Sequence, residues 1–316
     1  MRALITGIGG FAGRHLAGLL EAEGLEVWGI DRPKSDPPSP RVLRFDLLDR
    51  GMAREALETA GPDLVFHLAA QSAPSLAWKD PEATLRNNLF VQMNLLEALR
   101  GLPLHPRVLV VSSGEVYGTP QRLPVMEADP LLPTNPYALS KAVQDLMAYQ
   151  YYAAFGIPII RVRPFNHLGP GQSDDFVLPT LARQVAEVEA GKRPPVIQVG
   201  NLQARRDFTD VRDIVRAYYL AAVKGEPGNV YNIGSGRAVS IQSLLDFLLQ
   251  ETPTSIKVEQ DPARYRPVDI PLAWTDAAKL RRVTGWRPTI PLETTVREVL
   301  EYWRARVGQT APDNPS

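Results

Sequence analysis

A glycine-rich turn near the start of the sequence limits the folds open to this chain more than any other feature. Residues 6 to 13 read TGIGGFAG, between the apolar run RALIT and a helical pattern, so the turn joins a strand to a helix. Gly7 permits a tight turn, Gly10 lets the backbone approach a pyrophosphate, and Gly13 lets the helix pack closely on the strand. Amides at the helix N-terminus then face the anion. The spacing predicts a dinucleotide-binding unit, with a turn that binds no ligand as the alternative.

Short β-branched runs alternate with helical patterns over the first two thirds of the chain. This alternation predicts an α/β protein with a doubly wound parallel sheet of the Rossmann type. From about residue 165 the loops become longer and the helices shorter, which indicates a smaller C-terminal α/β region. We predict a dinucleotide-binding domain at 1–165 to which some later segments return, a mainly substrate-binding region at 166–307, and a disordered tail at 308–316. Expected strands cover 2–6, 25–30, 42–45, 64–68, 107–112 and 158–163, and expected helices 11–24, 52–60, 81–101, 135–156, 211–223 and 241–249.

The composition excludes several classes of function. The 316 residues include 35 basic and 35 acidic side chains, so no overall field favours a nucleic acid or an anionic membrane. The chain has no cysteine, which excludes disulfides, thiolate metal sites and a cysteine nucleophile, and its four histidines do not cluster as metal ligands would. The stretch MRALITGIGG enters a strand-like run without the pattern of a signal peptide, and no 18 apolar residues run together. A cytoplasmic protein without a metal is expected.

The end of the second predicted strand bears on the choice of cofactor. Asp31 follows the glycine turn by about 20 residues, where a carboxylate accepts hydrogen bonds from the ribose hydroxyls of a dinucleotide. Its charge would repel a 2′-phosphate, so NAD(H) is favoured, although the adjacent Arg32 and Lys34 could offset the repulsion and admit NADP(H). Asp46, after the third strand, is interpreted either as an acceptor for the adenine amino group or as a turn cap.

A tyrosine and a lysine share one helix face in the stretch TNPYALSK. Asn135 is expected to cap this helix, so Tyr137 and Lys141 lie one turn apart. An ammonium beside a phenol favours the phenolate, and we therefore expect Lys141 to lower the pKa of Tyr137 toward neutrality. Ser113, at the end of a neighbouring strand, would complete a site that moves a proton to or from a carbonyl or alcohol. The alternative is an ordinary exposed pair.

These motifs together resemble the extended short-chain dehydrogenase/reductase family of the NAD-dependent epimerase/dehydratase type. The matching stretches are TGIGGFAG, LAAQS at 68–72, SSGEVYG at 112–118 and YALSK at 137–141, in the family's order. The resemblance implies a nucleotide-sugar substrate and a catalytic triad of Ser113, Tyr137 and Lys141. It also implies cofactor contacts from Gly7, Gly10, Phe11, Ala12, Gly13, Asp31, Leu68, Ala69, Ala70, Tyr137, Lys141, Pro164 and Asn166. Arg32, Asp46 and Leu47 are predicted as further cofactor contacts.

Within this family, the C-terminal half is similar to the GDP-4-keto-6-deoxy-D-mannose reductases and the GDP-mannose 4,6-dehydratases. The similar stretches are RPFNHLGPGQSDDFVLP, IQVGNLQARRDFTDVRDIVRAY, VYNIGSG and RYRPVDIP. A GDP-sugar carries two phosphates, which arginine forks can bind bidentately. His167 is interpreted as loop structure. The substrate contacts implied are Ser72, Ser113, Asn166, Phe176, Val177, Asn201, Arg206 and Arg266.

Glu115 decides between two reactions within this group. A 4,6-dehydratase needs a second acid/base group near C5 and C6 of the sugar, and Glu115 stands where dehydratases carry a glutamate, although related reductases also carry an acid there. Phe208 follows the Arg-Asp pair where dehydratases typically have tryptophan, and the chain and its cofactor loop are short. We therefore predict NAD(P)H-dependent reduction of the C4 ketone of a GDP-4-keto-6-deoxyhexose. The alternatives are a dehydratase (a lyase), a 4-epimerase, and a non-enzymatic NAD-sensing protein.

The helices predicted at 81–101 and 135–156 carry more apolar and aromatic surface than one sheet face can cover. In the resembling family, these two helices pair across a dimer as a four-helix bundle. We therefore predict a homodimer.

Overall fold

The central element of the structure is a seven-stranded sheet in which all neighbouring strands are parallel. The computed structural model describes residues 1–33, 41–103, 105–265 and 267–309. The strand order is β11-β6-β5-β4-β1-β2-β3, which confirms the predicted doubly wound sheet and places the reversal between β1 and β4. Ligands bind at such a reversal, outside the carboxyl ends of the strands. The strands are β1 (Arg2–Thr6), β2 (Glu26–Asp31), β3 (Val42–Arg44), β4 (Leu64–His67), β5 (Arg107–Val111), β6 (Ile159–Pro164) and β11 (Val230–Ile233).

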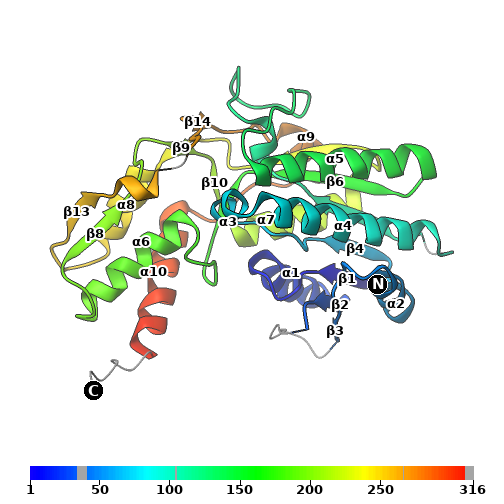
Figure 1. The fold of residues 1–316 in the computed structure, drawn as a ribbon, viewed down its shortest axis with the longest axis horizontal. Helices are drawn as coiled ribbons and strands as arrows, with labels where there is room; N and C mark the ends of the chain where they lie inside the picture. Colours follow the sequence, from blue (N-terminus) through cyan, green and yellow to red (C-terminus); the bar gives the residue numbers. More distant parts are fainter. Residues whose placement is uncertain (34–40, 104, 266, 310–316) are drawn as a thin grey trace.

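Helices cover both faces of this sheet, so its central strands are buried on both sides (Figure 1). Successive side chains of β4 and β5 enter two separate cores: Phe66 and Leu109 join one cluster, and Val65 and Val108 join the other. The helices of the first cluster are α1 (Phe11–Ala22), α7 (Val211–Lys224) and α9 (Ala278–Thr284), and those of the second are α2 (Arg50–Ala60), α4 (Pro81–Arg100) and α5 (Pro136–Phe155).

Helix α5 is fixed firmly to the sheet and to its own first turn. The Asn135 side chain caps it by accepting a hydrogen bond from the amide of Ala138. Further along, the fully buried carboxylate of Asp145 accepts bonds of 2.8 Å from both Arg161 and Arg163 of β6. Removing one partner from a buried ion pair of this kind typically costs about 3–5 kcal/mol. The helix that carries Tyr137 and Lys141 is therefore held in one position on the sheet.

A smaller region, at the left of Figure 1, has its own core. Its helices pack together through buried Leu181, Leu245 and Trp303, among others. The strands here are short and form sheets of only two or three members. The elements are α6 (Val177–Glu189), α8 (Ile241–Gln250), α10 (Leu292–Gln309), β7 (Asn166–Leu168), β8 (Val196–Val199), β9 (Arg205–Arg206), β10 (Phe208–Asp210), β12 (Val239–Ser240), β13 (Lys257–Gln260) and β14 (Leu272–Ala273).

The two regions are interleaved along the chain. After β7 to β10, the chain returns to the large sheet with α7 and β11, leaves it again, and comes back with α9. Helix α10 continues to Gln309, two residues past the predicted end of the folded chain at 307, because Val307 is buried in the smaller core. The rest of the predicted tail lies outside the described residues.

The sequence predicted neither strand β11, nor helices α6, α9 and α10, nor the short strands of the smaller region. Three further short elements were also not expected. They are α3 (Pro74–Lys79) and the 3₁₀ turns η1 (Gly114–Tyr117) and η2 (Pro262–Arg264). Residues of α3 and η1 line the cavity described below. Among the described helices, none is long and apolar enough to cross a membrane, and the described side chains contain no group of three His, Cys, Asp or Glu placed to hold a metal.

Candidate active site

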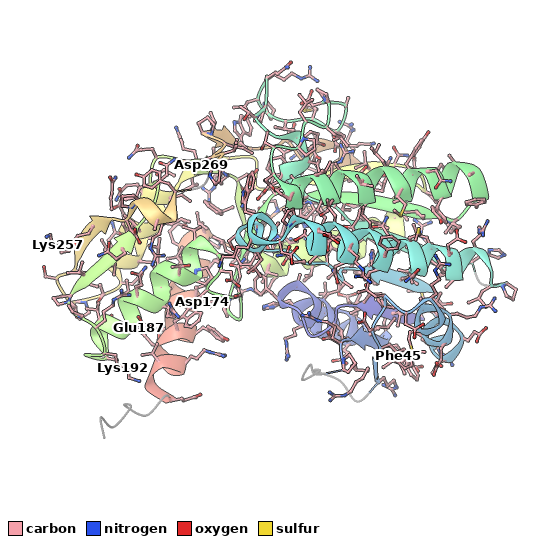
Figure 2. All side chains as sticks on the ribbon, viewed as in Figure 1. Phe45, Asp174, Glu187, Lys192, Lys257 and Asp269 are labelled. Atoms are coloured by element: carbon pink, nitrogen blue, oxygen red, sulfur yellow. The ribbon has the colours of Figure 1, made fainter. Side chains whose placement is uncertain are left out.

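A cavity of about 1170 Å³ lies across the carboxyl edge of the large sheet and reaches the smaller region. Phe45, beside β3, and Asp269, near β14, both line it although they lie far apart in the molecule (Figure 2). Among the residues that the structure describes, it brings together every predicted site residue except Asn201. The predicted residues that line it are Gly7, Gly10, Phe11, Ala12, Gly13, Asp31, Arg32, Asp46, Leu47, Leu68, Ala69, Ala70, Ser72, Ser113, Glu115, Tyr137, Lys141, Pro164, Asn166, Phe176, Val177 and Arg206.

The glycine turn forms one wall of the cavity, and its backbone geometry requires glycine. Gly7 has φ +73°, and a Cβ on Gly13 would lie only 2.3 Å from the carbonyl oxygen of Gly7. No side chain caps helix α1, which begins at this turn. Its N-terminal amides thus remain available for an anion. A dinucleotide pyrophosphate fits this arrangement.

Two carboxylates line the cavity beside β2 and β3. Asp31, at the end of β2, accepts hydrogen bonds from the amide of Gly9 at 2.7 Å and from its neighbour Arg32 at 2.8 Å. The first bond ties the glycine turn to β2, and each oxygen retains a lone pair for a ligand. Asp46 accepts a bond from the amide of Leu48 at 2.9 Å. Asp46 is therefore a turn cap that also lines the cavity, so both of its predicted roles stay open.

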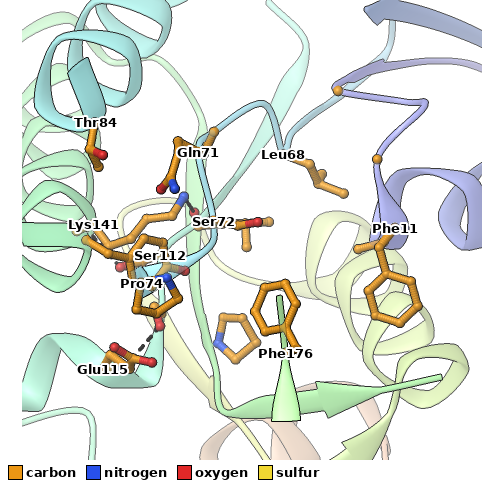
Figure 3. Close-up of a pocket in the computed structure, with 18 of the residues that line it drawn as sticks. Phe11, Leu68, Gln71, Ser72, Pro74, Thr84, Ser112, Glu115, Lys141 and Phe176 are labelled. Carbon is orange, nitrogen blue, oxygen red and sulfur yellow. Dashed lines mark hydrogen bonds between the residues drawn. The ribbon is translucent and has the colours of Figure 1, made fainter. Parts of the chain in front are cut away.

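The predicted triad lies in the middle of the cavity. Ser113 follows β5, Tyr137 and Lys141 project from α5, and each of the three side chains is more than nine-tenths buried. Lys141 donates a hydrogen bond of 2.9 Å to the carbonyl of Val111. In Figure 3, Lys141 and Glu115 lie on one side of the cavity, opposite Leu68 and Phe11. A substrate carbonyl placed beside Tyr137 would meet both a phenol and the Ser113 hydroxyl.

Burial governs the protonation of this triad. Burial raises the pKa of Tyr137, the charge of Glu115 raises it further, and a hydrogen bond with Ser113 lowers it. Burial also lowers the pKa of Lys141 to about 7. The prediction that Lys141 brings the pKa of Tyr137 toward neutrality is therefore wrong, because desolvation penalises both the phenolate and the ammonium. Tyr137 keeps its proton at neutral pH.

Glu115 is fixed by the residue that caps helix α5. Its carboxylate accepts a bond of 2.9 Å from the side-chain amide of Asn135, whose oxygen caps the helix. The Glu115 amide also donates to the Ser113 hydroxyl oxygen at 3.1 Å. Asn135 was predicted as a cap alone. Through its bond to Glu115, Asn135 also sets the position of that carboxylate relative to Tyr137, which follows Asn135 by two residues.

A carboxylate that the sequence did not reveal lies at the far end of the cavity. Asp269 accepts a bond of 2.7 Å from Arg206 and one of 2.6 Å from Asn201. Arg206 lines the cavity. Asn201 lies outside the lining and contributes by its hydrogen bond to Asp269. The predicted contact Arg266 lies outside the described residues. The end predicted for the diphosphate thus contains the ion pair of Arg206 with Asp269.

His167 was interpreted from the sequence as loop structure, and this interpretation is wrong. His167 belongs to β7, lines the cavity, and stacks on Phe11 with the ring centroids 5.9 Å apart. Burial lowers its pKa. Phe11 belongs to α1, so this stack joins the dinucleotide turn to the segment that carries Asn166. Its two members are 156 positions apart in the sequence, and no local pattern signals the contact.

Comparisons with known proteins match nearly the whole chain. A family model described as GDP-mannose 4,6 dehydratase matches residues 4–299. The chain is 36% identical to a GDP-6-deoxy-D-mannose reductase of Pseudomonas aeruginosa, over 97% of this chain and 98% of that protein. It is 30% identical to a GDP-mannose 4,6-dehydratase of Sinorhizobium fredii, over 94% and 93% of the two chains. The solved structure of RMD from Pseudomonas aeruginosa complexed with NADPH is similar with a TM-score of 0.87 and 34% identity, and covers 96% of this chain and 99% of that chain.

Proposed function

The chain belongs to the GDP-mannose 4,6-dehydratase family of extended short-chain dehydrogenases/reductases, and we propose that it reduces the C4 ketone of a GDP-4-keto-6-deoxyhexose with NAD(P)H. One observation carries the choice of reaction. The relative that is 36% identical from end to end is a reductase, whereas the dehydratase relative is 30% identical. Phe208 after the Arg-Asp pair supports the same choice.

The buried triad can supply the proton chemistry of this reduction. A bound nicotinamide supplies the hydride that C4 receives. Tyr137, which is protonated at neutral pH, gives its proton to the oxygen on C4, so the ketone becomes an alcohol. Ser113 donates a hydrogen bond to the same oxygen while negative charge develops on it. Lys141, when protonated, stabilises the phenolate that Tyr137 becomes.

Asp31 supports a preference for NAD(H) over NADP(H). Its carboxylate is held at the end of β2 by the Gly9 amide, and its negative charge disfavours a 2′-phosphate. The similar solved structure contains NADPH, so the preference requires a direct measurement. We expect kcat/KM to be higher with NADH than with NADPH, and the reverse order would assign Asp31 no discriminating role.

An assay with two substrates tests the proposed reaction. GDP-mannose and its 4-keto-6-deoxy derivative are offered separately, and NAD(P)H absorbance is followed together with the product. Stoichiometric consumption of NAD(P)H with the keto sugar alone is the expected result. Conversion of GDP-mannose without net consumption of the cofactor would instead establish the dehydratase, which Glu115 in the cavity favours as the second candidate.

Tyr137→Phe separates an enzyme from an NAD-sensing protein. This change removes only the hydroxyl, so turnover should fall at least about a hundredfold, because a general acid is lost, while cofactor affinity stays within about twofold. Calorimetric titration with NAD(H) provides the binding measurement. A wild-type protein that binds NAD(H) but turns over neither sugar would favour the sensor.

A partly exposed apolar face supports the proposed homodimer. Leu139, Leu146 and Tyr149 of α5, and Phe90 of α4, are each more than 40% exposed. They lie on the two helices that form the four-helix bundle in the resembling family. Sedimentation should therefore give a dimer, and a monomer at all concentrations would refute the bundle. The cytoplasmic location stays a prediction.

A further inference from the structure

Tyr218 of helix α7 is a buried tyrosine at the wall of the active-site cavity. The residue is 1% exposed, and its ring packs in the core cluster beneath β5 and β6 with Leu109 and Ile160. It nevertheless belongs to the lining of the cavity that contains Tyr137. The Tyr218 side chain is thus held by the core and also forms part of the cavity wall.

The Tyr218 hydroxyl has no hydrogen-bond partner among the residues that the structure describes. The other buried tyrosines differ in this respect. Tyr117 donates to Asn232 at 2.7 Å, Tyr151 donates to Glu97, and the Tyr231 hydroxyl accepts from the amide of Glu226 at 3.0 Å. Tyr137, the fourth, interacts with Ser113. A fully buried phenol normally finds a partner, because an unmade hydrogen bond costs about 1–3 kcal/mol. The Tyr218 hydroxyl is not among the fully buried polar atoms without a partner, which agrees with its place at the cavity wall. An exception at a cavity wall suggests that a ligand supplies the partner.

The surroundings of Tyr218 keep its hydroxyl protonated. Burial raises the pKa of Tyr218, and the charge that Tyr137 would carry as a phenolate raises it further. Tyr218 can therefore donate one hydrogen bond and accept another at neutral pH. Both tyrosines line the same cavity.

The chemistry of the reduction limits which ligand group Tyr218 can meet. The carbon that gives the hydride must lie about 3–3.5 Å from the ketone carbon whose oxygen Tyr137 protonates. The nicotinamide ring must therefore lie beside Tyr137, and its carboxamide is attached to the ring carbon next to the hydride-donating one. That carboxamide offers a carbonyl acceptor and an amide donor, which match a phenol.

We propose that Tyr218 is a positioning residue whose hydroxyl hydrogen-bonds the carboxamide of the nicotinamide and so holds the ring in one orientation against the sugar. The inference rests on the proposed function only in requiring a nicotinamide cofactor. It applies equally to a reductase, a dehydratase or an epimerase built on this triad.

Cofactor binding without sugar tests this role. Tyr218→Phe keeps the packed ring and removes only the hydroxyl, and Tyr219→Phe, its neighbour on α7 outside the cavity lining, is the matched control. Dissociation constants are measured by calorimetry for NADH and for ADP-ribose, which lacks the nicotinamide. Tyr218→Phe should weaken NADH about five- to tenfold and leave ADP-ribose unchanged, whereas Tyr219→Phe should change neither.

Two results would overturn the proposal. Equal weakening of NADH and ADP-ribose by Tyr218→Phe would show a structural effect on the whole site, and no change in NADH affinity would show that the hydroxyl makes no contact. If the wild-type protein bound neither NADH nor NADPH, the proposed function itself would fail, which is a different result from a change confined to the variant.

Discussion

The two ends of the active-site cavity, which we propose hold the cofactor and the substrate, are built by different means. At the cofactor end, the wall is the glycine turn, where Gly7 and Gly13 allow backbone to approach backbone and Asp31 fastens the turn to β2. At the substrate end, the wall consists of side chains that bind one another, with Asp269 between Arg206 and Asn201. The first end rests on seven parallel strands and the second on sheets of two or three short strands.

This difference affects what each end must do when a ligand arrives. No side chain caps helix α1, so a pyrophosphate can bind its N-terminal amides without displacing a capping side chain. Arg206 already has an anionic partner in Asp269. A diphosphate must share Arg206 with Asp269 or displace it, and part of the binding free energy is then lost to that exchange. The cofactor end should therefore be sensitive to changes in shape and the substrate end to changes in charge.

Gly13→Ala should produce the largest effect and confine it to the cofactor end. The new Cβ would lie 2.3 Å from the Gly7 carbonyl and 2.7 Å from that of Ile8, which are backbone atoms that cannot move aside. We expect NAD(H) affinity to fall at least a hundredfold and the free energy of unfolding to fall by about 3 kcal/mol. Gly18→Ala, on the same helix with open space around its Cβ, is the control and should stabilise the protein slightly. Equal behaviour of the two variants would contradict a shape-limited cofactor end.

Arg206→Gln should affect the substrate end alone. Losing the charge that faces the diphosphate should raise KM for the GDP-sugar about ten- to a hundredfold, with NAD(H) affinity unchanged. Arg205→Gln, the exposed neighbour that donates to the carbonyl of Ala238, should change KM less than twofold. Similar KM values for the two variants would place the diphosphate elsewhere.

Lys141→Met should show that the buried ammonium of Lys141, in the triad between the two ends, lowers the stability of the folded protein. The pKa of Lys141 falls from its ordinary 10.5 to about 7 in the folded protein, so below pH 7 the folded state carries a buried ammonium that the unfolded state solvates freely. The unfolded state binds more protons between pH 7 and 10.5, so wild-type stability rises with pH across this window.

Urea unfolding of both proteins at several pH values measures this effect. Lys141→Met should be more stable than wild type by about 2–4 kcal/mol at pH 6, and the difference should shrink toward pH 10, although the variant loses activity. A difference that is constant with pH would show that Lys141 titrates normally.

Glu115→Gln should produce the smallest effect. The amide oxygen of Gln can still accept the bond from Asn135, so the geometry around Tyr137 is preserved. For a reductase, kcat/KM with the keto sugar should change less than about tenfold. A fall of a hundredfold or more would indicate that the reaction needs a carboxylate as acid or base, as a dehydratase does.

The sequence predicted the cofactor end better than the substrate end, because the first is built from local backbone patterns and the second from contacts between distant side chains. The glycine turn, the alternating strands and helices, and the spacing of Tyr137 and Lys141 are local patterns of backbone conformation. The contact of Arg206 with Asp269 joins residues 63 positions apart, and the stacking of His167 on Phe11 joins two different regions. The pKa of Tyr137 was wrongly predicted because it depends on burial, which spacing along one helix does not reveal.

Transfer of deuterium from the cofactor to the sugar tests the central claim most directly. The keto sugar is incubated with NADH or NADPH carrying deuterium at the reactive position of nicotinamide carbon 4, with the two faces labelled in separate samples, and the product is examined by NMR. The account predicts one deuterium at C4 of the sugar for each cofactor oxidised, from one of the two labelled faces only. A product without deuterium at C4, or turnover that oxidises no cofactor, would contradict it.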